Sequence, residues 1–136
     1  MNRDVLYFGV GGARGFDMLA AEYMIHVREK IKNRVRVISV RPYPGYMDAW
    51  PEEEKRWQEE IIRKSDKVVR ISRENYPGVF YERDRELVDG SGHVISCCRR
   101  ITGGTAYTVR CAMEQGIPVM NACSWDLKQL DRPKKD

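Results

Sequence analysis

The chain has 136 residues, enough for one hydrophobic core, and its net charge of +4 is spread so evenly that no basic stripe indicates a nucleic-acid track. No apolar stretch approaches the roughly 20 residues of a membrane span, and the charged start "MNRD" is not typical of a signal peptide. We therefore expect one cytoplasmic domain over residues 1–136, with an irregular tail after about residue 124.

The first half of the chain alternates short β-branched runs with amphipathic segments. "DVLYFGV" (4–10) and "RVRVISV" (34–40) have the length and composition of strands, and a helix is predicted over 16–32 between them. Apolar residues recur in this helix at steps of three or four and predict its buried stripe: Leu19, Ala20, Tyr23, Val27 and Ile31. A second helix is predicted over 51–65, because proline and acids open it and bases close it.

The second half continues the alternation. Strands are predicted over 67–72, 93–98 and 117–122, and helices over 79–89 and 105–115, the latter ended by Gly116. Strands that alternate with crossover helices predict an α/β fold of three layers, α/β/α, with a mostly parallel sheet of about five strands.

The cysteines are Cys97, Cys98, Cys111 and Cys123. They lack the paired CxxC spacing of a zinc site and fall in or beside predicted core elements, so we expect buried thiols and no disulfide. No metal or cofactor is expected.

Two glycine-rich junctions follow predicted strands, "GGARGFD" (11–17) and "GGT" (103–105). Ligands of open α/β sheets bind beyond the carboxyl ends of strands, where helix N-terminal amides favour an anion and glycine lets it approach. Residues 103–105 are thus predicted to hold a phosphate or carboxylate, the alternative being that Gly103 and Gly104 only form a tight turn. Asp17 is expected either to cap its helix or to accept a sugar hydroxyl.

Two further segments carry candidate ligand contacts. "RPYPGYMDAWPEEEKRW" (41–57) follows a strand, and Tyr43, Tyr46 and Trp50 are candidates for a wall on which a base stacks. Trp57 is expected in the core with Ile61. Arg83 follows the turn at 76–78 and forms either a solvated surface pair or a contact to an anionic ligand.

Four stretches, at 11–22, 41–72, 76–91 and 103–119, resemble the YpsA-like proteins of the SLOG superfamily, relatives of the DprA and LOG folds. The resemblance implies a Rossmann-like fold and a pocket for a nucleotide or nucleotide-derived ligand. The residues expected to bind that ligand are Gly11, Gly12, Ala13, Arg14, Gly15, Asp17, Pro42, Tyr43, Trp50, Arg83, Gly103, Gly104, Thr105 and Thr108.

The sequence departs from the family pattern at its start, where the usual first strand and its TGHR-like loop are missing. Either strands 5–10 and 93–98 pair directly or another chain supplies the contact, since unpaired strand edges are costly when buried. A homodimer is therefore expected.

Catalytic signals are weak. The phosphoribohydrolase branch of the superfamily uses a glutamate after its glycine loop, where this chain has Val109, Arg110 and Cys111, so no catalytic residue is assigned. We expect a non-catalytic nucleotide-binding or nucleotide-sensing module. The alternatives are phosphoribohydrolase-like cleavage of an N-glycosidic bond and DprA-like binding of single-stranded DNA.

Overall fold

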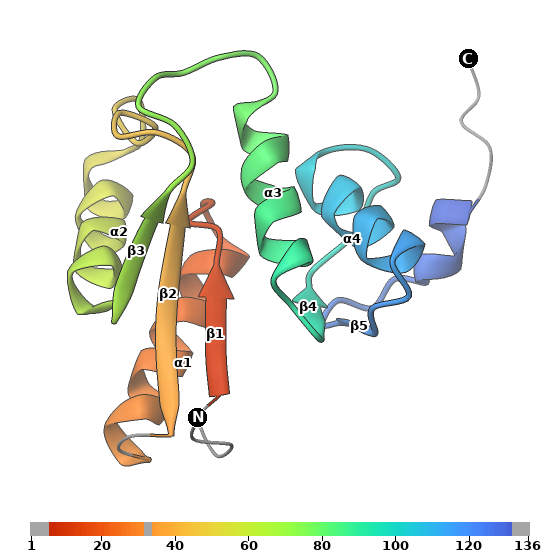
Figure 1. Cartoon of the computed structure of the whole chain (residues 1–136), viewed down its shortest axis with the longest axis horizontal. Helices are drawn as coiled ribbons and strands as arrows, with labels where there is room; N and C mark the ends of the chain where they lie inside the picture. Colours follow the sequence, from red (N-terminus) through yellow and green to blue (C-terminus); the bar gives the residue numbers. More distant parts are fainter. Residues whose placement is uncertain (1–5, 32–33, 132–136) are drawn as a thin grey trace. The chain divides into compact units, whose positions relative to one another are not determined.

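The computed structural model describes residues 6–31 and 34–131 (Figure 1). Contacts between residues divide the chain into two compact units, Met1–Arg83 and Asp84–Asp136. Each unit is described by itself, as unit 1 and unit 2. No helix within the described ranges has both the length and the apolar character needed to cross a membrane.

Unit 1 is built on three parallel strands in the order β1-β2-β3. Its elements are β1 (Leu6–Val10), α1 (Phe16–Lys30), β2 (Val35–Arg41), α2 (Glu52–Lys64) and β3 (Lys67–Arg70), and α3 (Val79–Asp89) begins within it. Parallel strands need crossovers, and α1 and α2 supply them while packing against each other (Figure 1). The loops after β1 and β2 therefore leave from the same edge of the sheet.

The core of unit 1 lies between its sheet and its first two helices. It consists of Val10, Met18, Ala21, Ile25, Val35, Val37 and Ile61, with Trp50 and Trp57 packed against it. The prediction that Trp57 and Ile61 share the core is confirmed.

The predicted buried stripe of α1 is wrong except at Val27, which packs against the core. Leu19 and Tyr23 are 59% and 66% exposed, whereas Met18 and Ala21 are each 1% exposed. Because α1 is apolar on most of its sides, the period of 3.6 residues alone does not identify the face that meets the sheet. The buried stripe runs through Met18, Ala21 and Ile25. It lies about one residue further round the helix axis than the predicted stripe.

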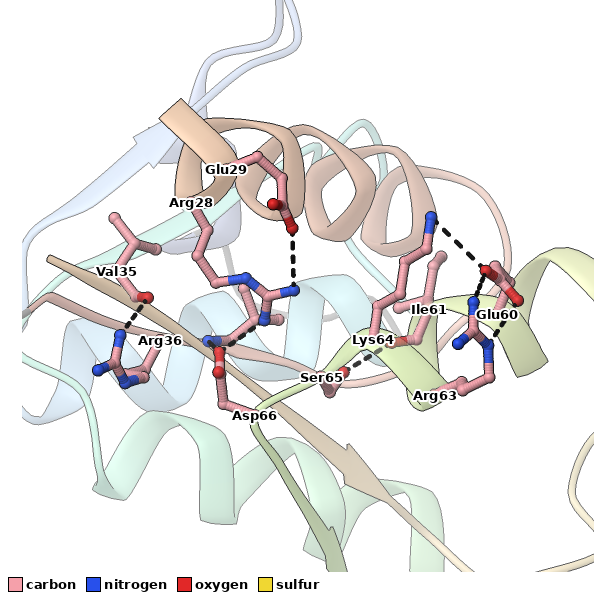
Figure 2. A network of polar contacts seen from close by, with 11 residues as sticks. Arg28, Glu29, Val35, Arg36, Glu60, Ile61, Arg63, Lys64, Ser65 and Asp66 are labelled. Carbon is pink, nitrogen blue, oxygen red and sulfur yellow. Dashed lines mark hydrogen bonds and ion pairs between the residues drawn. The ribbon is translucent and has the colours of Figure 1, made fainter. Parts of the chain in front are cut away.

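One carboxylate ties three elements of unit 1 together (Figure 2). Asp66 accepts hydrogen bonds from the Val37 amide of β2 at 2.8 Å and from the Arg28 guanidinium of α1 at 2.7 Å. Burial raises the pKa of Asp66, but these two donors outweigh it, so the net pKa lies below its ordinary value of 3.8. The start of β3 is thereby fixed to α1 and β2.

Unit 2 holds a second, two-stranded parallel sheet. Its elements after α3 are β4 (Val94–Ser96), α4 (Gly104–Glu114), β5 (Val119–Asn121) and a short 3-10 helix (Leu127–Asp131). Two small clusters pack around α4, one of Cys98, Ala106, Val109 and Leu130 and one of Val88, Cys111 and Ala112. Leu130 is buried, so the segment expected to be irregular after about residue 124 contributes to a core up to this point.

The fold is the predicted Rossmann-like α/β type, with five parallel strands and four α-helices among the described residues. The strands form two sheets, and β4 and β5 are shorter than predicted, at three residues each. The predicted starts of the first strand (4–5) and the end of the first helix (32) lie outside the described residues.

The prediction for the cysteines is half right. Cys98 and Cys111 are buried thiols, as expected. Cys97 and Cys123 instead form a disulfide, with their Cα atoms 5.0 Å apart. Sequence spacing gave no sign of this pair, because the register of β4 against β5 brings the two residues together.

Candidate functional site

The loop between β1 and α1 depends on glycine for two reasons. Gly12 and Gly15 have φ angles of 72° and 88°, where side chains are strained. A Cβ on Gly12 would also lie 2.6 Å from the Tyr46 hydroxyl and 2.9 Å from Nε2 of Gln58. The loop therefore packs its backbone directly on two polar side chains that come from the region after β2 and from α2.

Asp17 orders this loop. Its Oδ2 accepts a hydrogen bond from the Ala13 amide at 3.4 Å, and the Gly11 amide also donates to it. Burial raises the pKa of Asp17, and Arg83 and the two amides lower it by less, so the net pKa lies above 3.8. The expected capping role is wrong, because the N-cap of α1 is Gly15 and receives no side-chain hydrogen bond.

Tyr46 lies at the centre of a buried polar group. The Gln58 amide donates to its hydroxyl at 3.0 Å, and the Arg41 guanidinium carbon lies 5.7 Å from its ring centroid. Burial raises the pKa of Tyr46 more than the Gln58 hydrogen bond and the charges of Arg41 and Arg83 lower it, so the phenol stays protonated. Oε1 of Gln58 and Nε of Arg41 are buried and have no hydrogen-bond partner among the described residues.

Arg83 joins the same region of unit 1. It is 6% exposed, its guanidinium carbon lies 5.3 Å from the Phe80 ring centroid, and its charge acts on both Asp17 and Tyr46. Phe80 in turn meets Tyr43 edge-on at 6.0 Å. The sequence alternative of a solvated surface pair does not fit a guanidinium so deeply buried. We call Asp17, Arg41, Tyr46, Gln58 and Arg83 the Tyr46 cluster.

Three other predicted ligand contacts of unit 1 have different surroundings. Trp50 packs on the core and against Tyr46, with ring centroids 5.5 Å apart. Pro42 is buried, and its carbonyl accepts the Ser72 amide at 2.9 Å. Arg14 donates to Glu54 on the surface at 2.5 Å. These contacts explain how Trp50, Pro42 and Arg14 are held in place without a bound ligand.

The second glycine loop leads into α4 of unit 2. Gly103 has a φ of 97° and is the N-cap of α4, and its carbonyl accepts the Tyr107 amide at 3.0 Å. Thr108 donates its hydroxyl to the Gly104 carbonyl at 2.9 Å, while Thr105 is exposed. The turn therefore requires glycine at position 103 whether or not a ligand binds.

Asp84 stands beside this second loop. It is 7% exposed, and its Oδ2 lies 3.4 Å from where a Cβ on Gly104 would be. A carboxylate at this point attracts hydroxyl or amino donors and repels phosphate. Within the described part of the chain, no group of three or more histidine, cysteine, aspartate or glutamate side chains is placed to hold a metal ion.

Sequence reasoning missed Arg41, Gln58, Phe80 and Asp84 as members of these sites. Gln58 carried a usable signal, since it lies one turn before Ile61 on the buried face of α2. A polar side chain on a core face needs a partner. The other three carried none, because a single charged or aromatic residue in the sequence does not show whether its side chain is buried or what it contacts.

The chain matches a protein family over most of its length. A family model named YpsA, described as the YspA SLOG family, matches residues 1–115 and so includes both glycine loops and Arg83. No curated protein matches the chain. The chain belongs to the YpsA family of SLOG proteins.

Proposed function

We propose that the chain binds a nucleotide or nucleotide-derived ligand without converting it, and that the Tyr46 cluster recognises its phosphate. Membership of the SLOG family suggests a nucleotide-related function. The observation that carries the proposal is a buried donor, Nε of Arg41, and a buried acceptor, Oε1 of Gln58, that both lack partners in the part of the chain that the structure describes. A phosphate oxygen can accept from this Nε, and a hydroxyl or amino group of the same ligand can donate to this Oε1. Natural proteins rarely leave buried donors and acceptors unsatisfied except where something else binds them.

The charge of the cluster suits an anion. It contains two guanidinium groups, Arg41 and Arg83, and one carboxyl group, Asp17, whose pKa is raised. Tyr46 stays neutral because its pKa is raised as well. The cluster thus carries at least one positive charge, and guanidinium groups bind phosphate oxygens through paired N–H donors.

The neighbouring aromatic rings suit a base. Phe80 is 42% exposed and meets Tyr43 edge-on. An exposed ring beside a buried guanidinium offers a stacking surface next to a phosphate contact. This assigns the expected stacking role to Tyr43 and Phe80 instead of Trp50.

The second glycine loop differs from the Tyr46 cluster in the chemical groups that it attracts. Asp84 beside Gly104 favours a hydroxyl or amino group at that position over a phosphate. We therefore propose that the loop of Gly104 and Thr105, taken by itself, contacts a hydroxyl or amino group of a ligand. Replacing Gly104 with leucine tests this loop independently of the Tyr46 cluster.

Calorimetric titration of the full chain tests the proposal, with ADP-ribose, NAD, cyclic dinucleotides and common nucleotides as the panel. Arg83→Lys keeps the charge that faces Asp17 but loses the planar fork, so we expect at least about tenfold weaker binding. Arg73→Lys, at an exposed arginine of the same unit, is the matched control and should bind as the wild type does.

Gln58→Leu tests the same site from α2. It removes the unpartnered Oε1, which favours stability, and the hydrogen bond from Nε2 to the Tyr46 hydroxyl, which disfavours it, so thermal melting serves as the folding control while affinity should fall at least about tenfold. A panel without any heat of binding, or full affinity in both Arg83→Lys and Gln58→Leu, would contradict the proposal. Release of free base or ribose phosphate, seen by chromatography, would favour the phosphoribohydrolase alternative.

The homodimer stays a prediction, and β1 gives it support. Within the described residues β1 pairs only with β2, and Leu6 and Tyr7 on it are 57% and 66% exposed. An outer strand with exposed apolar side chains is a surface on which strands of other chains add. Sedimentation analysis of the full chain tests for a dimer. The expected cytoplasmic location would be tested by imaging a fluorescent fusion.

A further inference from the structure

Two cysteines face each other where β4 and β5 end. Ser96 and Asn121 are opposite one another in the parallel register, Cys97 directly follows β4, and Cys123 lies two residues beyond β5. Their Cα atoms are 5.0 Å apart, and the sulfur atoms are bonded. Both residues are partly exposed, whereas Cys98 and Cys111 are buried. Reagents from solvent can therefore reach this pair and not the other two thiols.

Asn121 holds the two segments together without help from the covalent bond. Its side chain accepts the Cys98 amide at 2.8 Å and donates to the carbonyls of Cys98 at 2.9 Å and Trp125 at 3.0 Å. These bonds span both strand ends and involve no sulfur. The thiols of Cys97 and Cys123 therefore stay opposed when the disulfide is open, which is what a reversible pair requires.

Arg99 distinguishes the two sulfur atoms. Its Nε donates to Sγ of Cys123 at 3.3 Å. A guanidinium beside a sulfur favours the thiolate, which is the nucleophilic form of cysteine. Cys123 is thus the sulfur better prepared to attack an oxidant, and Cys97 is placed to resolve the product.

We propose that Cys97 and Cys123 form a peroxide-reactive, reversible thiol pair. The Cys123 thiolate attacks one oxygen of hydrogen peroxide, the O–O bond breaks, and a sulfenic acid forms while hydroxide leaves and takes up a proton as water. The Cys97 thiolate then attacks the Cys123 sulfur, the S–O bond breaks, and a second hydroxide leaves as the disulfide forms. In sum, two thiols and one peroxide give one disulfide and two waters, and an external dithiol returns the pair to thiols by exchange.

The test starts from the full chain, reduced and then freed of reductant. Hydrogen peroxide should remove two of the four thiols, and peptide mapping should find the Cys97–Cys123 cross-link with Cys98 and Cys111 still free. In Cys97→Ser, the sulfenic acid should persist on Cys123 and be trapped by dimedone. In Cys123→Ser, dimedone should label Cys97, the one remaining cysteine that is partly exposed among the described residues, much more slowly.

Arg99→Ala tests the assignment of the attacking sulfur. Its first oxidation step should be about 3- to 10-fold slower, because the thiolate fraction of Cys123 falls. The matched control is Arg100→Ala, which removes an adjacent exposed arginine and should oxidise at the wild-type rate. Equal rates in the two variants would overturn the role of Arg99, and oxidation at Cys98 or Cys111, or between chains, would overturn the pair. A disulfide that an external dithiol leaves intact under native conditions would show a permanent cross-link and also refute the proposal.

Discussion

Gly12→Ala perturbs the point where the first glycine loop meets the Tyr46 cluster. Alanine at a φ of 72° costs about 1–2 kcal/mol of backbone strain. Its Cβ would also lie 2.6 Å from the Tyr46 hydroxyl, a distance that forces this hydroxyl and the Gln58 amide to move. Disrupting a buried hydrogen bond costs about 1–3 kcal/mol, so we expect the free energy of unfolding to fall by about 2–5 kcal/mol.

A double-mutant cycle separates the two contributions. Tyr46→Phe removes the atom closest to the new Cβ, so Gly12→Ala should cost about 1–2 kcal/mol less in that background. Urea unfolding followed by the fluorescence of Trp50 and Trp57 reports on unit 1, because both rings pack on its core. Trp125 lies in unit 2 and is replaced by phenylalanine throughout. Strictly additive effects of the two substitutions would show that the loop does not rest on Tyr46.

Three further predictions concern unit 1. Asp66→Asn should lower the free energy of unfolding by about 1–3 kcal/mol near neutral pH. Because the pKa of Asp66 is depressed in the folded state, this difference from wild type should fade as the pH falls below 3.8. Urea unfolding at several pH values measures it. Asp17→Asn should become more stable relative to wild type as the pH rises above 3.8, because a carboxyl group with a raised folded pKa stabilises the wild-type fold less over that range. A difference in the free energy of unfolding that stays constant from pH 3 to 8 would contradict the raised pKa. Met18→Ala should lower the free energy of unfolding by about 2–5 kcal/mol, and Leu19→Ala by less than about 0.5 kcal/mol, because Met18 is 1% exposed and Leu19 is 59% exposed. Thermal or urea unfolding measures both, and the reverse order would support the stripe predicted from the sequence.

The order and type of the elements could be read from the sequence because local signals were strong. The run of acids and bases in α2 and the β-branched run of β2 each matched one structure only. The buried face of α1 could not be read, because apolar residues surround that helix and only the sheet selects among them. The disulfide between Cys97 and Cys123 depends on strand register, which one sequence does not encode locally.

The candidate site was predicted in part for a related reason. The glycines at 12, 15 and 103 were found because positive φ angles leave a direct mark on the sequence. Arg83 was named with two alternatives, and its burial beside Phe80 speaks against the solvated surface pair, while contact with an anionic ligand stays a prediction. Gln58 escaped notice, since its role comes from the Tyr46 hydroxyl twelve residues away.

Side-chain nuclear magnetic resonance of the full chain tests the binding role of the Tyr46 cluster most directly. When a nucleotide from the panel is added, the Nε proton of Arg41 should shift and become protected from exchange, because a phosphate oxygen accepts it. The amide signals of Gln58 should shift as well, because its Oε1 gains a hydroxyl or amino donor from the ligand. The side-chain signals of Arg73, exposed in the same unit, should not move. A saturating ligand that leaves the Gln58 and Arg41 signals in place would contradict the account.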